Sequence, residues 1–341
     1  MKPVPPPRVL VLRALGLGDL LAAVPALRGL RRGFPDHEIV LATPPSLRDA
    51  ALATGAVDTI LPATAPRRGV PVLTGWHGAP PDIAVDLHGN GPESYAALAA
   101  LRPRRILAYA CPPADGLPPP GWEREDHERE RWCRLLRAWG IEADPGDVRL
   151  PRPSCPSPAP DAVVVHPGAE AAARCWPVRR YSAVVRGLLA EGHRVVVTGG
   201  PAEAELAAAV AEGAGLGPRD VLSGGLPFAR LSALIADAGC VVSGDTGLAH
   251  LAVAHGTPSV TLFGPVAPRL WGPPPDDPRH TALWYPGPPG DPHGTSADPS
   301  LLRIGADEVL AAALAHAGHR STAGEGPTPE GFRPVEAQGR A

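Results

Sequence analysis

The sequence predicts an α/β protein of two domains, each a parallel sheet covered by helices. Short valine- and leucine-rich runs alternate with longer helical patterns along the chain, which is typical of strand–helix–strand units. A chain of 341 residues exceeds what one ordinary core fills, so two domains of about 150 residues each are expected. Five prolines within residues 151–160 exclude a helix or a central strand there and divide the chain into two halves.

Residues 1–150 make the predicted N-terminal domain. It opens with a strand over residues 8–13 and a helix over 19–32, in which Asp19 is suited to the N-cap position. Residues 111–121 are rich in proline and glycine and are expected to form a loop. The other predicted elements are strands over 38–42, 57–61, 82–86 and 104–108 and a charged helix over 123–139.

The predicted C-terminal domain covers residues 161–317, after a semi-rigid linker at 151–160. Beyond Ala317 the composition turns to glycine, threonine, proline and glutamate, which predicts a disordered tail over 318–341. The predicted strands are 161–166, 193–198, 240–243 and 259–263, and the predicted helices are 179–190, 202–212, 227–236, 246–255 and 306–315.

Composition and charge limit the class of protein. The net charge of −3 argues against a nucleic-acid-binding protein, which usually carries a strong basic excess. The five cysteines are scattered and form no CxxC pair, so neither a zinc site nor a disulfide framework is expected. The opening residues MKPVPPP lack the apolar core of a signal peptide, and no apolar run is long enough to span a membrane. We expect a cytoplasmic protein with at most peripheral membrane association.

The first motif is GLGD at residues 16–19, between the first strand and the first helix. Glycines such as Gly18 let the backbone approach a ligand, and the helix start offers free N–H groups to an anion. A dinucleotide fingerprint would need a third glycine, where this chain has Leu21. Asp19 either caps its helix or serves as a base that takes a proton from an acceptor hydroxyl. Arg13, at the end of the strand, is a further candidate to contact phosphate or acceptor.

The second motif ends the strand predicted at 161–166 and continues into an RCWP sequence. Its loop, with Gly168 and Ala169, can expose backbone N–H groups to a ligand. Arg174 is either a surface arginine or a partner for a diphosphate, which its planar guanidinium suits. For Trp176 we favour a place in the core or at a domain edge.

The third motif, SGDTGLAH at residues 243–250, is the most informative. A buried strand ends in a turn and a helix starts at Thr246, so the N–H groups of Thr246 and Gly247 form a seat for a diphosphate. His250 lies one turn into the helix on roughly the same face, near the phosphate site, although a lone helical histidine is more often a structural residue. Asp245 repels phosphate and is expected to point toward loop N–H groups or sugar hydroxyls.

No DxD motif of the kind that holds a divalent cation beside a nucleotide diphosphate is present, and Asp276 and Asp277 in a proline-rich loop are a poor substitute. The charge of a leaving diphosphate would then be met by Arg174, a helix start and loop amides. We therefore expect no bound metal and no cofactor.

Taken together, the GLGD opening, the HPGA…RCWP block and SGDTGLAHLAVAHGTPSVTLFGP resemble glycosyltransferase family 9. This is the ADP-heptose:lipopolysaccharide heptosyltransferase family, with the GT-B fold of two facing Rossmann-like domains. The three separated blocks agree in order from Arg8 to Pro268. The resemblance implies an inverting, metal-independent transfer with Asp19 as base. It also implies a nucleotide site in the second domain that includes Gly168, Ala169, Arg174, Asp245, Thr246, Gly247 and His250.

Two departures from the family leave the donor sugar open: family members often place hydroxyl residues at the positions of Gly168 and Ala169, and a lysine at that of Arg174. We expect a nucleotide-sugar donor, ADP-heptose or similar, and a glycan or glycolipid acceptor that binds near Asp19. The acceptor is either the lipopolysaccharide core or another glycan. Three alternatives stay open: a sugar-nucleotide epimerase on the same fold, an oxidoreductase using NAD at the GLG turn, and a non-catalytic nucleotide-sugar-binding protein.

Overall fold

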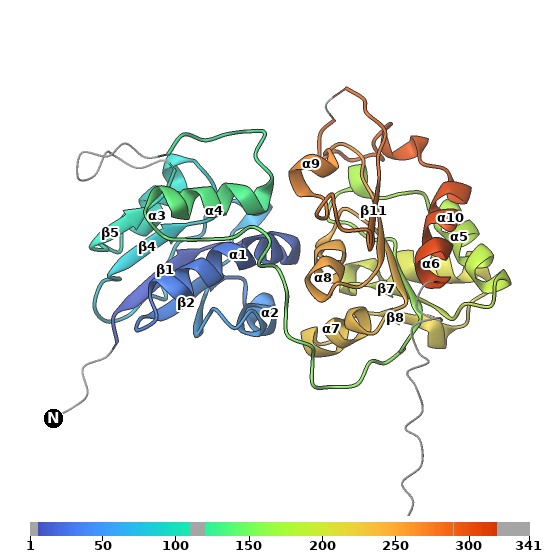
Figure 1. The fold of residues 1–341 in the computed structure, drawn as a ribbon, viewed down its shortest axis with the longest axis horizontal. Helices are drawn as coiled ribbons and strands as arrows, with labels where there is room; N and C mark the ends of the chain where they lie inside the picture. Colours follow the sequence, from blue (N-terminus) through green and yellow to red (C-terminus); the bar gives the residue numbers. More distant parts are fainter. Residues whose placement is uncertain (1–5, 110–119, 289, 319–341) are drawn as a thin grey trace, which may run out of the picture.

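The computed structural model describes residues 6–109, 120–288 and 290–318, which form two lobes side by side (Figure 1). Each lobe is built around one parallel sheet, so the predicted α/β class with two sheets is confirmed. The loop predicted at 111–121 and the tail predicted at 318–341 fall almost entirely outside the described residues. We keep 151–160 as the proposed boundary, since this segment holds no helix or strand.

The N-terminal lobe contains a five-stranded sheet in the order β3-β2-β1-β4-β5. Alternate residues of its central strand enter the cores on the two faces: Val9 and Val11 pack on one side, Leu10 and Leu12 on the other. Its strands are β1 (Arg8–Leu12), β2 (Glu38–Thr43), β3 (Thr59–Pro62), β4 (Ile83–Asp86) and β5 (Arg105–Leu107). Its helices are α1 (Leu17–Gly33), α2 (Arg48–Ala53), α3 (Pro92–Ala99) and α4 (Glu128–Ala138).

The C-terminal lobe contains a six-stranded sheet in the order β11-β10-β9-β6-β7-β8. The short strands β8 and β11 at its two edges were not predicted from the sequence. Its strands are β6 (Val163–His166), β7 (Val195–Gly199), β8 (Val221–Ser223), β9 (Cys240–Gly244), β10 (Ser259–Leu262) and β11 (His280–Leu283). Its helices are α5 (Val178–Ala190), α6 (Ala204–Ala214), α7 (Phe228–Ala236), α8 (Gly247–His255), α9 (Pro268–Trp271) and α10 (Ala306–Gly318).

Both sheets place their loops for ligand binding in the same way. In each lobe the first strand lies inside the sheet, with the second strand on one side and a later strand on the other: β1 lies between β2 and β4, and β6 between β7 and β9. Parallel sheets bind ligands at the carboxyl ends of their strands, where the strand order reverses in this way. The three sequence motifs follow β1, β6 and β9, so all three lie at such an edge.

Helices α1 and α8 join the two lobes. Leu21 and Val24 of α1 share a buried apolar cluster with Leu248 and Leu251 of α8. Figure 1 shows α1 reaching from the first sheet toward α8 in the other lobe. The two helix starts, which carry the first and third motifs, are therefore held together. Within the described part of the chain, no helix has the length and apolar character needed to cross a membrane.

Candidate functional site

A cavity of about 570 Å³ opens where the two lobes meet. It is lined from the N-terminal lobe by the start of α1 and by Arg68, and from the C-terminal lobe by the loops after β6, β7, β8 and β9. The predicted site residues that line it are Gly18, Asp19, Ala169, Arg174, Asp245, Thr246, Gly247 and His250. The first and third motifs thus line one ligand-accessible space.

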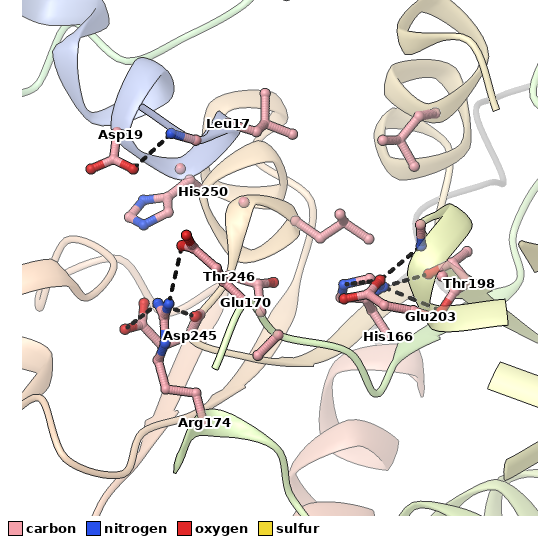
Figure 2. A pocket seen from close by; sticks show the side chains of 18 of the residues that line it. Leu17, Asp19, His166, Glu170, Arg174, Thr198, Glu203, Asp245, Thr246 and His250 are labelled. Atoms are coloured by element: carbon pink, nitrogen blue, oxygen red, sulfur yellow. Dashed lines mark hydrogen bonds and ion pairs between the residues drawn. The ribbon is translucent and has the colours of Figure 1, made fainter. Parts of the chain in front are cut away.

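Asp19 lies at the start of α1, but not at the N-cap. The sequence interpretation was wrong on this point, because α1 begins at Leu17 with Gly16 as its N-cap. As the third residue of the helix, Asp19 reaches back and accepts a hydrogen bond from the Gly16 N–H at 3.1 Å. Its carboxylate thereby caps the helix and faces the cavity at the same time (Figure 2).

Two arginines act on the Asp19 carboxylate. One nitrogen of Arg68 donates to both oxygens, at 2.8 and 3.0 Å, and Arg13 lies 3.5 Å from Oδ1. Burial raises the pKa of Asp19, but the charges of Arg13 and Arg68 and the hydrogen bonds from Arg68 and Gly16 outweigh it. The pKa therefore lies below its ordinary value, and the Asp19 carboxylate is ionised near neutral pH.

Arg13 does not reach the cavity. Its side chain is fully buried, where its guanidinium donates to the Leu87 carbonyl and, at 2.8 Å, to Glu128. Glu128 also accepts from Arg131 and from the Trp132 indole N–H. The expectation that Arg13 contacts phosphate or acceptor fails in this structure because its donors are engaged inside the lobe. Arg13 instead fixes the position of Asp19, whose backbone carbonyl it also contacts.

Arg68 is a site residue that the sequence interpretation missed. It lies in the loop after β3, and both Arg67 and Arg68 have left-handed backbone angles, with φ of 52° and 58°. Such angles are uncommon for residues other than glycine and persist where the surroundings impose them. Here Arg68 bridges the lobes, since it binds Asp19 on one side and Glu170, at 2.9 Å, on the other. No sequence motif marks this arginine.

The start of α8 offers free polar groups to the cavity. Thr246 is the N-cap and the helix proper begins at Gly247, one residue later than predicted. The Thr246 hydroxyl is buried and has no hydrogen-bond partner among the described residues, and the same holds for the Nε of Arg174, which also lines the cavity. Buried polar atoms nearly always have partners, so these two groups are candidates for contacts with a ligand. We call Thr246, Gly247 and Arg174 the anion seat.

Asp245 and Arg174 contact each other at the base of this seat. Arg174 donates to the Asp245 carbonyl at 3.3 Å, and its guanidinium lies 4.0 Å from the Asp245 carboxylate. Burial raises the pKa of Asp245 to about 6, even though the charge of Arg174 lowers it. A proton on Asp245 would lessen its repulsion of a phosphate group. Asp245 thus titrates close to neutral pH inside the cavity.

His250 stays uncharged at the junction of the two helices. Burial lowers its pKa to about 3, helped by the nearby charges of Arg129 and His127. Its ring stacks edge-on against Trp271, with ring centroids 5.8 Å apart. A side chain added at Gly18 would lie 3.0 Å from this ring, which shows how closely α1 and α8 approach. His250 therefore lines the cavity as an uncharged side chain that can donate or accept a hydrogen bond.

The loop after β6 contributes fewer of its predicted residues to the cavity lining than expected. Ala169 lines the cavity, whereas Gly168 lies outside its lining, buried against the carboxyl group of Glu203. An added side chain at Gly168 would lie 2.2 Å from that carboxyl group, so this position serves close packing. Trp176 is buried in the core of the lobe, as predicted.

The far end of the cavity lies over β6, β7 and β8. Glu203 accepts a hydrogen bond from the Gly200 N–H at 2.7 Å and lies 3.8 Å from His166, whose other ring nitrogen contacts Thr198 at 3.2 Å (Figure 2). Apolar side chains complete this end: Leu222, Leu226 and Leu231. The cavity is therefore charged near Asp19 and Arg174 and mixed apolar and acidic at its other end. Among the described residues, no cluster of three or more His, Cys, Asp or Glu side chains is arranged to hold a metal ion.

Two facing Rossmann-like lobes with a cavity at the carboxyl edges of both sheets define the GT-B class of fold. Known structures share it. One described as "Structure of E. coli ADP-heptose lps heptosyltransferase II" superposes with a TM-score of 0.72 at 21% identity, covering 92% of this chain and 100% of that one. One described as "E. coli heptosyltransferase WaaC with ADP" has a TM-score of 0.64 at 20% identity, covering 89% of this chain and 97% of that one.

The sequence comparisons each match only part of the chain. Residues 147–288 match the family model of glycosyltransferase family 9 (heptosyltransferase). A stretch of 113 residues is 37% identical to "Lipopolysaccharide heptosyltransferase 3" of Escherichia coli and covers 33% of each protein, so the match spans about a third of that relative. Residues 147–288 are therefore similar to glycosyltransferase family 9, and the whole chain has the GT-B fold.

Proposed function

We propose that the protein is an inverting glycosyltransferase that moves a sugar from a nucleoside-diphosphate donor to a hydroxyl group of a glycan or glycolipid. One observation carries this proposal: an ionised carboxylate, Asp19, and the anion seat line the same cavity from opposite lobes. A transferase needs both a proton acceptor and a site for the leaving diphosphate, within reach of one sugar.

The donor would bind mainly to the C-terminal lobe. Its diphosphate fits the anion seat, where the amides at the start of α8, the Thr246 hydroxyl and the Arg174 guanidinium all present hydrogen-bond donors. The nucleoside fits the end lined by Glu203 and the three leucines, because a carboxylate after the second strand of such a sheet suits ribose hydroxyls. The matched relatives are named for heptose transfer, and one solved neighbour contains ADP, so we propose ADP-heptose or a similar nucleotide sugar.

The acceptor would enter beside Asp19 in the N-terminal lobe. Its hydroxyl oxygen attacks the anomeric carbon of the donor sugar while its proton passes to the Asp19 carboxylate. The bond between that carbon and the diphosphate oxygen breaks on the opposite face, which inverts the configuration. The negative charge that leaves with the diphosphate is met by Arg174 and the α8 amides, which are already in place. The resemblance to lipopolysaccharide heptosyltransferases makes the lipopolysaccharide core the first acceptor to test.

The place of action that we propose is the cytoplasm, with at most peripheral membrane association. The cysteines of the described residues, Cys133, Cys155, Cys175 and Cys240, are all free thiols, which agrees with a reducing compartment.

The donor is identified by thermal-shift titration against a panel of nucleoside diphosphates and nucleotide sugars, because a ligand that binds only the folded state raises the melting temperature. We expect a diphosphate to give the largest shift, and Arg174→Ala to weaken its binding about tenfold or more, since a charge-assisted hydrogen bond is lost. The chosen donor is then incubated with and without acceptor glycans. Conversion of the donor sugar without an acceptor would support an epimerase instead, and binding without any turnover would support a non-catalytic protein.

A further inference from the structure

Glu170 points into the cavity from the loop after β6 (Figure 2). One of its carboxylate oxygens lies 2.9 Å from Arg68 and 3.5 Å from Arg174. The first arginine belongs to the N-terminal lobe and the second to the anion seat. The carboxylate thus joins two cations that come from different lobes.

A carboxylate between two guanidinium groups has the hydrogen-bonding chemistry of a phosphate oxygen. Glu170 engages Arg174, a member of the anion seat, and Arg68, the arginine opposite it. A diphosphate in the seat would need the same donors and would be repelled by the Glu170 charge. The side chain of Glu170 is 54% exposed, so it can turn toward solvent without a large loss of buried contacts.

We infer that Glu170 is an internal competitor for the diphosphate: its carboxylate holds Arg68 and Arg174 until an anionic ligand displaces it. This residue then sets the affinity of the site for anions, and its displacement frees Arg68 to contact the incoming ligand. The inference rests on the proposed donor site and adds to it a residue that opposes binding.

The test is isothermal titration with inorganic pyrophosphate, using wild type, Glu170→Gln and the control Glu205→Gln. Glutamine keeps the shape of the side chain and removes its charge, and Glu205 is an exposed residue of α6 outside the cavity lining. We expect Glu170→Gln to bind pyrophosphate about three- to tenfold more tightly, the range that one or two partly exposed ion pairs account for. The gain should shrink at about 0.5 M salt, where such pairs are screened. Glu205→Gln should match wild type, and uncharged adenosine should bind all three proteins equally.

Weaker binding of pyrophosphate by Glu170→Gln would overturn the inference, because it would show that the carboxylate supports the bound ligand. Unchanged binding by both Glu170→Gln and Glu170→Ala would overturn it as well. In either case wild-type binding of pyrophosphate and nucleoside diphosphate would leave the proposed function standing. If neither wild type nor the variants bind any of these anions, the anion seat itself is wrong and both proposals fail. Circular dichroism of each variant verifies that it is folded.

Discussion

One nitrogen of Arg68 donates to both carboxylate oxygens of Asp19, a residue of α1 that lies 49 positions earlier in the chain. The contact holds the proposed base ionised and also ties the loop after β3 to the start of α1. Because Arg68 lowers the pKa of Asp19, the arginine makes this carboxylate available at lower pH and reduces its strength as a base.

Removing Arg68 should therefore shift the pH dependence of the reaction. In Arg68→Gln the pKa of Asp19 rises, because burial raises it and one opposing charge is gone. The acid limb of kcat/KM, which reports protonation of the base, should move to higher pH, and Arg68→Lys should move it less. The profile is measured with the donor found by the binding panel. An unmoved acid limb accompanied by a uniform loss of rate would show that Arg68 serves the structure alone.

Asp245→Asn should stabilise the protein near neutral pH. The folded-state pKa of Asp245 is raised from 3.8 to about 6, so the folded protein holds this proton more tightly than the unfolded chain does. Wild type thus loses stability as the pH rises from about 4 to about 6. Above that range, the difference in pKa corresponds to a free energy of unfolding that is lower by about 3 kcal/mol.

Asparagine removes this loss, so the variant should melt at a higher temperature at pH 7.5 and at nearly the same temperature at pH 4. Thermal unfolding at both pH values measures the difference. Equal or lower stability of the variant at pH 7.5 would contradict the burial of an ionised Asp245.

Gly247→Ala should separate the two helix starts. An added methyl group at Gly247 would lie 2.9 Å from the Leu17 Cβ and 3.2 Å from the Gly18 nitrogen, so α1 and α8 would have to move apart. Overpacking of this kind costs about 1 to 3 kcal/mol, and we expect turnover to fall at least about tenfold as the acceptor and donor halves separate.

The matched control is Gly217→Ala, because an added methyl group there meets no atom of the described residues within 4 Å. Melting temperature and turnover are measured for both variants. If Gly247→Ala behaves like Gly217→Ala in both measurements, the close approach of α1 and α8 has no functional role.

Glu128→Gln should destabilise the N-terminal lobe. Glu128 is buried and pairs with Arg13 and Arg131. Its replacement removes the negative charge that these two buried guanidinium groups share. Breaking a buried pair costs about 3 to 5 kcal/mol, whereas Glu130→Gln on the same helix, which removes a more exposed pair with Arg137, should cost less than about 1 kcal/mol. Urea unfolding of both variants makes the comparison, and similar midpoints would refute it.

Those parts of the fold that follow from the periodicity of apolar residues and from the positions of glycines were mostly predicted from the sequence. The two parallel sheets, helices α1 and α8, and the three motifs at strand ends follow from local patterns of apolar residues and turns. Edge strands β8 and β11 escaped prediction because they have three and four residues, with half-buried rather than buried side chains. The N-cap of α1 was misplaced because Asp19 caps the helix from its third position. An acidic residue suits that position as well as the N-cap itself, so the residue type does not tell the two apart.

The site could be predicted only where its residues lie in a motif. Asp19, Arg174 and Thr246 stand at strand-to-helix junctions, where the backbone geometry is encoded locally. Arg68 and Glu170 meet through the packing of the two lobes, and no local pattern encodes that contact. Arg13 shows the reverse error: it lies just before a motif, but its partner Glu128 is 115 positions away and draws the side chain into the interior.

In the mechanism that we propose, Asp19 removes the acceptor proton while the anion seat binds the donor independently. Asp19→Asn separates these two roles when nucleoside-diphosphate affinity by calorimetry and sugar transfer by product analysis are measured on the same preparation. We expect affinity within about threefold of wild type and a rate lower by at least about a hundredfold, the usual contribution of a general base. Parallel loss of binding and transfer, or transfer at the wild-type rate, would contradict it.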